Sequence, residues 1–232
     1  MVGSAARRTA AMTRNARSPS FLQRNGLSLV LLLLFLVFLV GQVLTGMEVS
    51  NAERIEQGLL PESLAQYLAS GHFISATFEN WESEFLQMGM YVLLTVKLRQ
   101  KGSAESRPLD PAEEDERIDP GPAPWPLRKG GWWARLYANS LSLAYAALFG
   151  LAFLGHAWGS WTHEVEERSA QGLAAVSFGH HVASAQFWFE SMQNWQSEFL
   201  AVLSIVVLSI YLRQDQSPES KPLAAPNSQT GT

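Results

Sequence analysis

The hydrophobic residues of the chain gather into two long uncharged runs and two shorter ones. The long runs are Leu27–Leu44 and Leu141–Trp161. At 1.5 Å per residue, the first run covers about 27 Å as a helix, close to the thickness of a bilayer core. The shorter runs, Phe85–Val96 and Phe199–Leu212, each follow an aromatic segment that can extend the helix outward. We therefore predict an all-α membrane protein with four transmembrane helices.

The basic residues lie almost entirely on one side of these predicted spans. Of the 17 Lys and Arg residues, only Arg54 and Arg168 lie between the first and second runs or between the third and fourth runs. Because cytoplasmic segments carry the excess of Lys and Arg, we expect both termini and the central linker to be cytoplasmic. Short interfacial helices are expected in the outer loops, at about 48–80 and 162–194. A cleaved signal peptide is the alternative for the first run, but the run is long and no small-residue cleavage site follows it.

The two halves of the sequence match when the chain is shifted by 114 residues. Asn25–Leu109 then aligns without a gap with Asn139–Leu223, and 32 of the 85 positions are identical. The strongest match pairs Asn80–Leu86 with Asn194–Leu200. The chain is therefore predicted to contain two tandem two-span repeats. They should be parallel, because each holds an even number of spans. We expect the first span to pack on the second as the third packs on the fourth.

These boundaries divide the chain into five segments. They are a disordered basic N-terminus (1–24), the first repeat (25–102), a disordered cytoplasmic linker (103–131), the second repeat (132–214) and a disordered tail (215–232). The linker and the tail are rich in proline and polar residues, which is typical of flexible chain.

Three short motifs of this chain resemble those of an uncharacterised bacterial family of transmembrane proteins with a domain of unknown function. They are Asn25–Leu29 (Asn-Gly-Leu-Ser-Leu), Phe78–Leu86 (Phe-Glu-Asn-Trp-Glu-Ser-Glu-Phe-Leu) and Leu98–Ser106 (Leu-Arg-Gln-Lys-Gly-Ser-Ala-Glu-Ser). The resemblance covers roughly residues 24–223. It implies location in the inner membrane of a bacterium, and it implies no activity.

Composition excludes several classes of function. The chain has no cysteine, which rules out disulfides, thiolate metal sites and cysteine nucleophiles. The net charge of −4 argues against nucleic-acid binding. Because no hydrolase or phosphate-binding motif occurs, we predict no catalytic residue, no metal and no cofactor. The expected partners are the lipid bilayer and other cytoplasmic or membrane proteins, and the oligomeric state is left open.

Four polar residues are predicted to lie at membrane depth. Glu84 is 14 residues before Leu98, about 21 Å along a helix, and Glu198 occupies the matching position in the second half. Gln42 and His156 lie at about the same level on the neighbouring spans. The pairs Gln42–Glu84 and His156–Glu198 would reduce the cost of burying a carboxylate. The alternative is that both glutamates lie among lipid headgroups, where a helix N-terminus favours an acid.

Tryptophans and a duplicated motif mark the ends of the spans. The candidate interfacial anchors are Trp81, Trp195, Trp132, Trp133, Trp158 and Trp161. A motif that begins Leu-Arg-Gln follows both short runs and extends to Leu109 and Leu223. Its candidate cytoplasmic docking residues are Arg99, Glu105, Arg213 and Glu219. The alternative is that Arg99 and Arg213 end their helices and that the rest is left over from duplication.

Three functions fit this sequence. The leading hypothesis is a non-catalytic membrane scaffold or accessory protein, because no catalytic motif and no series of pore-lining charges appears. The alternative is a small ion- or proton-linked channel or transporter that uses Glu84 and Glu198. The third is a metal-dependent enzyme at the outer face, where His163 and its neighbouring glutamates would bind a metal with His180 or His181.

Overall fold

The computed structural model describes residues 20–113 and 118–231, and these ranges contain helices and no β-strand. The predicted all-helical class is therefore confirmed. Most of the basic N-terminal segment and the acidic run 114–117 lie outside the described residues. The elements are α1 (Phe21–Glu56), α2 (Leu64–Tyr67), α3 (Gly71–Lys97), η1 (Pro111–Glu113, a 3₁₀ turn), α4 (Trp125–Lys129), α5 (Gly131–Ala138), α6 (Ser140–Ala170), α7 (Phe178–Val182) and α8 (Ala185–Tyr211).

The chain divides into two compact units, with the boundary inside α1. The first unit is Met1–Gly46, and its described part consists of Ser20 and most of α1. Helix α1 begins with reciprocal bonds: the Gln23 backbone N–H donates to Ser20 Oγ, and the Ser20 N–H donates to the Gln23 side chain. This is a capping box, which satisfies two otherwise unpaired groups at the helix start. The second unit, Met47–Thr232, holds all the other helices.

Helices α3 and α8 begin and end with the same residue types, 114 positions apart. Each has 27 residues. Ser70 and Ser184 cap their N-termini, and each hydroxyl accepts a bond from the backbone N–H three residues on. At the other ends, the guanidinium groups of Arg99 and Arg213 donate to the last carbonyls of the helix. The same side-chain hydrogen bonds therefore fix the length of both helices.

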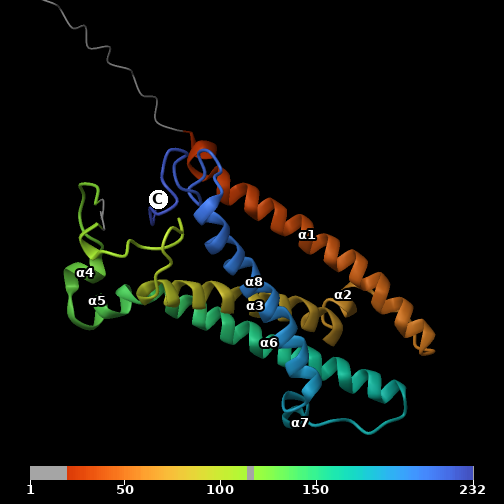
Figure 1. Ribbon diagram of the computed structural model, residues 1–232. Coiled ribbons are helices and arrows are strands. Elements are labelled where there is room, and N and C mark those ends of the chain that lie inside the picture. The colour runs from red at the N-terminus through yellow and green to blue at the C-terminus, as the bar shows by residue number, and fades with distance from the viewer. Residues whose placement is uncertain (1–19, 114–117, 232) are drawn as a thin grey trace, which may run out of the picture. The chain divides into compact units, whose positions relative to one another are not determined.

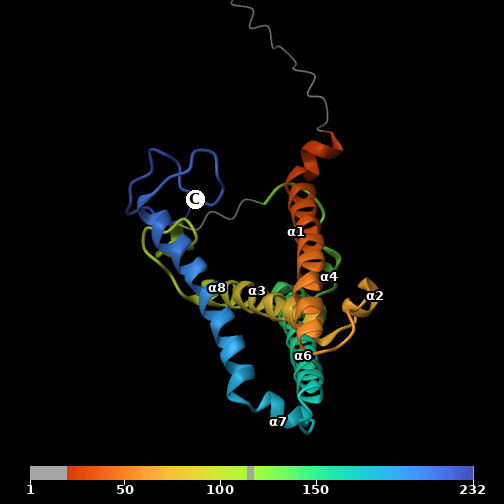
Figure 2. The same ribbon diagram turned by 90° about the vertical axis from the view of Figure 1, so that its right-hand side faces the viewer.

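The main packing contact of the second unit is between α3 and α6, which lie side by side and antiparallel (Figures 1 and 2). Glycines permit the close approach. A Cβ at Gly159 would lie 2.4 Å from the Ser75 backbone nitrogen, and one at Gly155 would overlap the Phe78 ring. Helix α8 crosses α3. The expectation that α6 packs chiefly on α8 is therefore wrong. Small residues at a helix interface let two backbones approach closely, and here they face α3.

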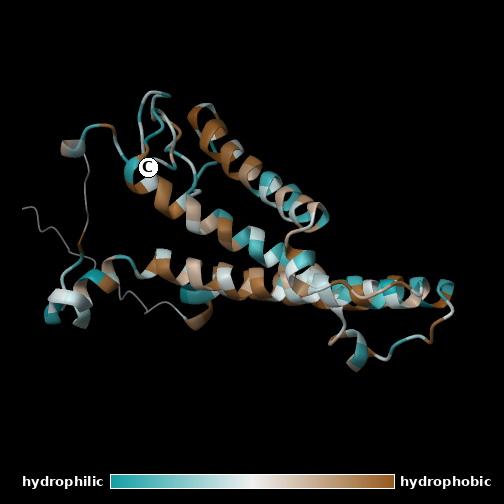
Figure 3. Cartoon of the chain, turned by 90° about the horizontal axis from the view of Figure 1, so that it is seen from below, coloured by the Kyte–Doolittle hydropathy of each residue, from teal (hydrophilic) through white to brown (hydrophobic). Residues whose placement is uncertain are grey.

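Burial in this unit is the reverse of that in a water-soluble protein. Among the described residues, the buried hydrophobic ones number only four: Tyr67, Ala152, Ala157 and Phe187. Polar residues dominate the buried set, while many Leu, Val, Ile and Phe side chains on α6 and α8 are exposed. Figure 3 shows α6 apolar over much of its length and polar toward Ala170. An apolar exterior around a polar interior is typical of a protein whose surface faces lipid.

In the part of the chain that the structure describes, three helices are long and apolar enough to cross a membrane: α1, α6 and α8. The second of the four predicted spans, α3, does not reach this level of apolarity, although it is as long as α8. Its polar residues Thr77, Glu82, Ser83 and Gln87 are buried inside the second unit. The short helices expected in the two outer loops are present as α2 and α7.

Candidate functional site

A buried histidine and a buried carboxylate form the centre of the second unit. His156 Nδ1 on α6 lies 2.9 Å from Glu82 Oε2 on α3, and both side chains are 0% exposed. The second carboxylate oxygen of Glu82 accepts a hydrogen bond of 2.8 Å from Trp195 Nε1 on α8. One carboxylate therefore links three helices through two hydrogen bonds.

The other ring nitrogen of His156 faces a third acidic residue. His156 Nε2 lies 3.9 Å from Glu190 Oε2 on α8, and the Glu190 side chain is 30% exposed. Within the described part of the chain, Nε2 has no hydrogen-bond partner, nor has the buried hydroxyl of the adjacent Ser191. The second oxygen of Glu190 accepts a bond from Gln186 Nε2 at 2.7 Å. The imidazole thus lies between a fully buried and a partly exposed carboxylate.

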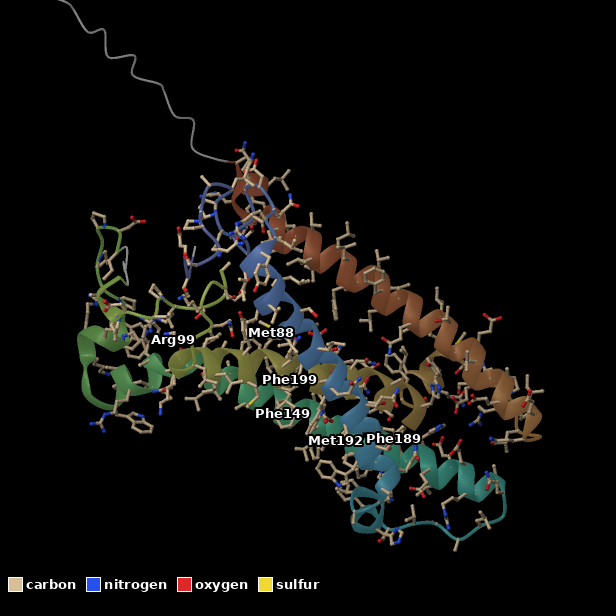
Figure 4. The ribbon with its side chains drawn as sticks, viewed as in Figure 1. Met88, Arg99, Phe149, Phe189, Met192 and Phe199 are labelled. Atoms are coloured by element: carbon tan, nitrogen blue, oxygen red, sulfur yellow. The ribbon has the colours of Figure 1, made fainter. Side chains whose placement is uncertain are left out.

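Aromatic and polar neighbours enclose this group, which we call the His156 cluster: His156, Glu82, Glu190 and Trp195. The Phe187 ring stacks on the imidazole, with centroids 4.9 Å apart. The ring of Phe149, labelled on α6 in Figure 4, lies 6.1 Å from that of Trp195. Glu79 accepts a hydrogen bond from Asn194 beside the cluster. The surroundings exclude solvent from His156 and leave Glu190 as the partly exposed acid of the cluster.

Of the predicted intramembrane residues, only His156 belongs to this cluster. Its predicted pairing with Glu198 is wrong, because the hydrogen-bonded partner is Glu82. Glu84 is exposed, and Glu198 is half-buried. Gln42 lies in α1, within the first compact unit. The predicted Gln42–Glu84 pair therefore stays a prediction.

The sequence interpretation missed Glu82 because it relied on identity between the halves. The residue that matches Glu82 is Gln196, so the identities between the two halves favoured Glu84 and Glu198 instead. Two signals were available. Glu79, Glu82 and Ser83 have the spacing of one helix face. Gly155 and Gly159 have the small-x-x-x-small spacing of a close helix contact.

The six predicted tryptophan anchors differ in their surroundings. Trp195 bonds inside the His156 cluster, and Trp161 Nε1 donates to the Val176 carbonyl at 2.9 Å. Trp132 and Trp158 are exposed, at 70% and 55%. The ring of Trp133, 42% exposed, lies near Trp125 and Lys129, and Trp81 contacts Phe78. Their interfacial role stays a prediction.

The histidines near α7 and the C-terminal part of α6 contact glutamates in pairs. His181 Nδ1 lies 2.5 Å from Glu164 Oε2, and its Nε2 lies 2.9 Å from the Ser160 hydroxyl. His163 Nε2 lies 3.7 Å from Glu167 Oε1, and His180 is exposed. Among residues 20–113 and 118–231, no three such side chains are grouped closely enough to hold a metal ion.

The candidate docking residues lie where α3 and α8 end. Arg99, labelled at the end of α3 in Figure 4, and Arg213 bond to helix carbonyls, as the alternative interpretation of the motif expected. Glu105 accepts a 2.8 Å hydrogen bond from the Tyr91 hydroxyl. The Glu219 backbone N–H donates to Ser217 Oγ, and its side chain is exposed.

Comparison with other proteins identifies a family for this chain but gives no activity. No curated protein and no solved structure matches the chain significantly. One family model does match, over residues 18–232. The chain therefore belongs to the family described as a domain of unknown function, DUF6766.

Proposed function

We propose that this protein is a proton-linked membrane protein in which His156 exchanges protons with its neighbouring carboxylates. The observation that carries the proposal is the fully buried contact between His156 Nδ1 and Glu82. Ionisable residues within membrane helices are costly and usually mark ion or proton pathways. Histidine suits this role because either ring nitrogen can bind a proton.

Three residues, ordered from the fully buried to the partly exposed one, form a short proton path. Glu82 is fully buried, His156 bonds to it, and Glu190 lies 3.9 Å from the opposite ring nitrogen with part of its side chain exposed. A proton received by Glu190 can pass to Nε2 while Nδ1 shares its proton with Glu82. The indole of Trp195 holds the second oxygen of Glu82 in place. This arrangement replaces the predicted use of Glu84 and Glu198.

The proposal includes four spans arranged as two repeats. Helix α3 packs antiparallel along α6, a candidate span, and its 27 residues are about 40 Å long. Its buried polar residues lower its hydropathy without facing lipid. The matched bounds and caps of α3 and α8 support a duplication. The arginine and lysine distribution favours cytoplasmic termini, and the sequence resemblance favours a bacterial inner membrane.

The test is proton flux into liposomes that contain the full-length protein and an internal pH-sensitive dye. An imposed membrane potential should drive proton entry in the wild type. His156→Gln should lose the flux, because glutamine cannot carry a proton. Glu190→Gln should reduce it strongly. The matched controls are His180→Gln and Glu84→Gln, which alter exposed residues of the same types.

Folding and function are separated by a second measurement. The ¹⁵N chemical shifts of His156 in the reconstituted protein report directly whether the ring gains and loses a proton. Equal flux in the wild type and His156→Gln, together with shifts that do not change with pH, would contradict the proposal. The His156–Glu82 contact would then be a structural link between α3 and α6. The scaffold hypothesis would become the better one, since it needs only a stable bundle.

A further inference from the structure

The motif that follows α3 and α8 has the same local structure in both places. We call residues 98–109 the first copy and residues 212–223 the second copy of the span-exit motif. The Gln100 backbone N–H donates to Ser106 Oγ, and the Gln214 N–H donates to Ser220 Oγ, both at 2.9 Å. Gly102 and Gln216 occupy matching positions and both have positive φ, 83° and 65°. The two copies therefore present matching backbone groups.

The C-terminal tail occupies the first copy. The Gly102 backbone N–H donates to Thr230 Oγ1 at 2.9 Å, and the Gly231 N–H donates to the Ser103 carbonyl at 2.9 Å. A Cβ at Gly102 would lie only 2.5 Å from the Asn227 carbonyl oxygen, so the tail crosses directly over this glycine. Gly231 lies against Ser106 and Pro108. The tail residues 226–231 thus cover four positions of the first copy.

A buried lysine fastens the tail in this position. Lys221 is 1% exposed, and its ammonium donates to the carbonyl oxygen of Gly102 at 2.6 Å. The same ammonium reaches the carbonyls of Asn227 and Gln229 at 3.2 and 3.0 Å. Charged donors make the stronger hydrogen bonds. The tail is therefore committed to the first copy of its own chain.

The second copy carries an open hollow where the first copy carries the tail. The hollow measures about 480 Å³, and its lining includes Gln216, Ser217, Ser220 and Pro222. These residues match Gly102, Ser103, Ser106 and Pro108, the four positions that the tail covers. The same surface is therefore filled in one copy and open in the other.

We propose that the second copy of the span-exit motif binds an extended, uncharged polar segment of a partner protein. The occupied first copy defines this chemistry. Its occupant, Pro-Asn-Ser-Gln-Thr-Gly at residues 226–231, has no charge and pairs through backbone groups and a threonine hydroxyl. Because the protein's own tail is fastened by Lys221, the segment comes from another protein. This inference does not depend on proton transfer at His156.

One difference between the copies sets the affinity. Gln216 stands where the first copy has Gly102, and a side chain at Gly102 would begin only 2.5 Å from the Asn227 carbonyl oxygen. A partner segment therefore lies farther from the backbone at this point. Removal of the side chain allows the closer approach, and it also suits the positive φ. Gln216→Gly should consequently tighten binding, whereas most surface substitutions leave it unchanged.

The experiment uses a synthetic peptide with the sequence of residues 226–232, carrying a photoreactive group, and the full-length protein in detergent. We expect the peptide to cross-link within residues 215–223. Gln216→Gly should strengthen binding about fivefold, as for one additional good hydrogen bond. Gln216→Trp, which fills the hollow, should weaken it about tenfold or more. Lys101→Trp, at an exposed position within the first copy, is the control, and a scrambled peptide is the second control.

Three results would overturn the proposal. The first is the absence of cross-linking, and the second is equal binding by the wild type and Gln216→Trp. The third is cross-linking confined to residues 102–109, because the peptide would then merely displace the tail. Self-association that disappears when residues 226–232 are removed would identify the occupant as a second copy of this chain and would overturn the assignment to a separate partner.

Discussion

Helices α3 and α8 have the same length and the same residue types at their ends, but they differ in the side chains that they bury and expose. Both have 27 residues, a serine N-cap and an arginine that bonds to the last carbonyls. Helix α3 buries Thr77, Glu82, Ser83 and Gln87. Helix α8 exposes a series of Leu, Ile, Val and Phe side chains. Of these two helices, only α8 is long and apolar enough to cross a membrane.

This difference shows that the residues that end a helix can stay the same while the residues on its packed face change. The end signals depend on the residues at the two ends of each helix, so they can be the same in both helices while the packed face changes. Glu82 in α3 corresponds to Gln196 in α8, and Gln87 corresponds to Ala201. An average over residues cannot tell a buried polar side chain from one that faces lipid. Hydropathy therefore underrates a helix whose polar face is turned inward.

The largest expected effect is an all-or-none difference in labelling across α3. The chain has no cysteine, so single cysteines can be introduced at Ser63 and at Lys101, both exposed positions. If α3 crosses the membrane as α8 does, an impermeant thiol reagent should label Ser63→Cys in intact cells. Lys101→Cys should be labelled only after permeabilisation. Ser103 is unsuitable because it is 0% exposed.

The matched control brackets α8 with cysteines at Ala183 and Asp215, which are also exposed. These should show the same pattern as the α3 pair. If Ser63→Cys and Lys101→Cys react from the same side while the α8 pair differs, α3 does not span. The four-span arrangement would then be wrong.

The next largest effect concerns the carboxylate that distinguishes α3. Glu82→Ala should lower the free energy of unfolding by about 3–5 kcal/mol, because it leaves the buried His156 without its partner. Glu84→Ala, which alters an exposed residue two positions away, should change stability by less than about 0.5 kcal/mol. Urea unfolding in mild detergent, followed by tryptophan fluorescence, measures both. Equal losses in the two variants would show that the Glu82 contact contributes little.

A smaller effect tests the close contact that holds α3 on α6. Gly159→Ala places a methyl group 2.4 Å from the Ser75 backbone nitrogen, and overpacking of this kind costs about 1–3 kcal/mol. At Gly150, on the same helix, a Cβ would meet nothing within 4 Å. Gly150→Ala should therefore stabilise by up to about 1 kcal/mol through helix propensity. The same unfolding assay should give opposite signs, and a matching sign would contradict the α3–α6 packing.

The sequence predicts features that depend on position along the chain, such as the helices and the depth of a residue. It does not predict the direction in which a side chain points around the helix axis. The apolar runs predicted the helical class, and the helix length estimate placed Glu84 at nearly the level of His156. The true partner, Glu82, is two residues away, which is about 200° around the helix axis. Depth depends only on residue count, whereas the face depends on which helix packs there. The predicted duplication favoured packing within each half, but glycines on α6 bring it against α3 instead.

The smallest expected effect is a pH dependence where the two helices end. Glu105 accepts a bond from Tyr91 of α3, whereas the residue of α8 that matches Tyr91 is Ile205. Burial raises the pKa of Glu105, and the neighbouring Glu219 carboxylate raises this pKa further, while the bond from Tyr91 opposes the rise. Because the folded pKa lies above the unfolded value of about 4.3, the stabilisation is complete below that value. It is lost as the pH rises through the folded pKa.

Amide hydrogen exchange of residues 222–231 should detect this change, since these residues adjoin the two copies of the span-exit motif. In the wild type, protection corrected for intrinsic exchange should increase from pH 8 to pH 5. Glu105→Gln remains uncharged throughout and should show a flat profile. Asp215→Asn, which alters an exposed acid in the same region, should keep the wild-type slope. A slope that persists in Glu105→Gln would assign the pH dependence to another group. The segments that follow α3 and α8 would then not differ in their electrostatics.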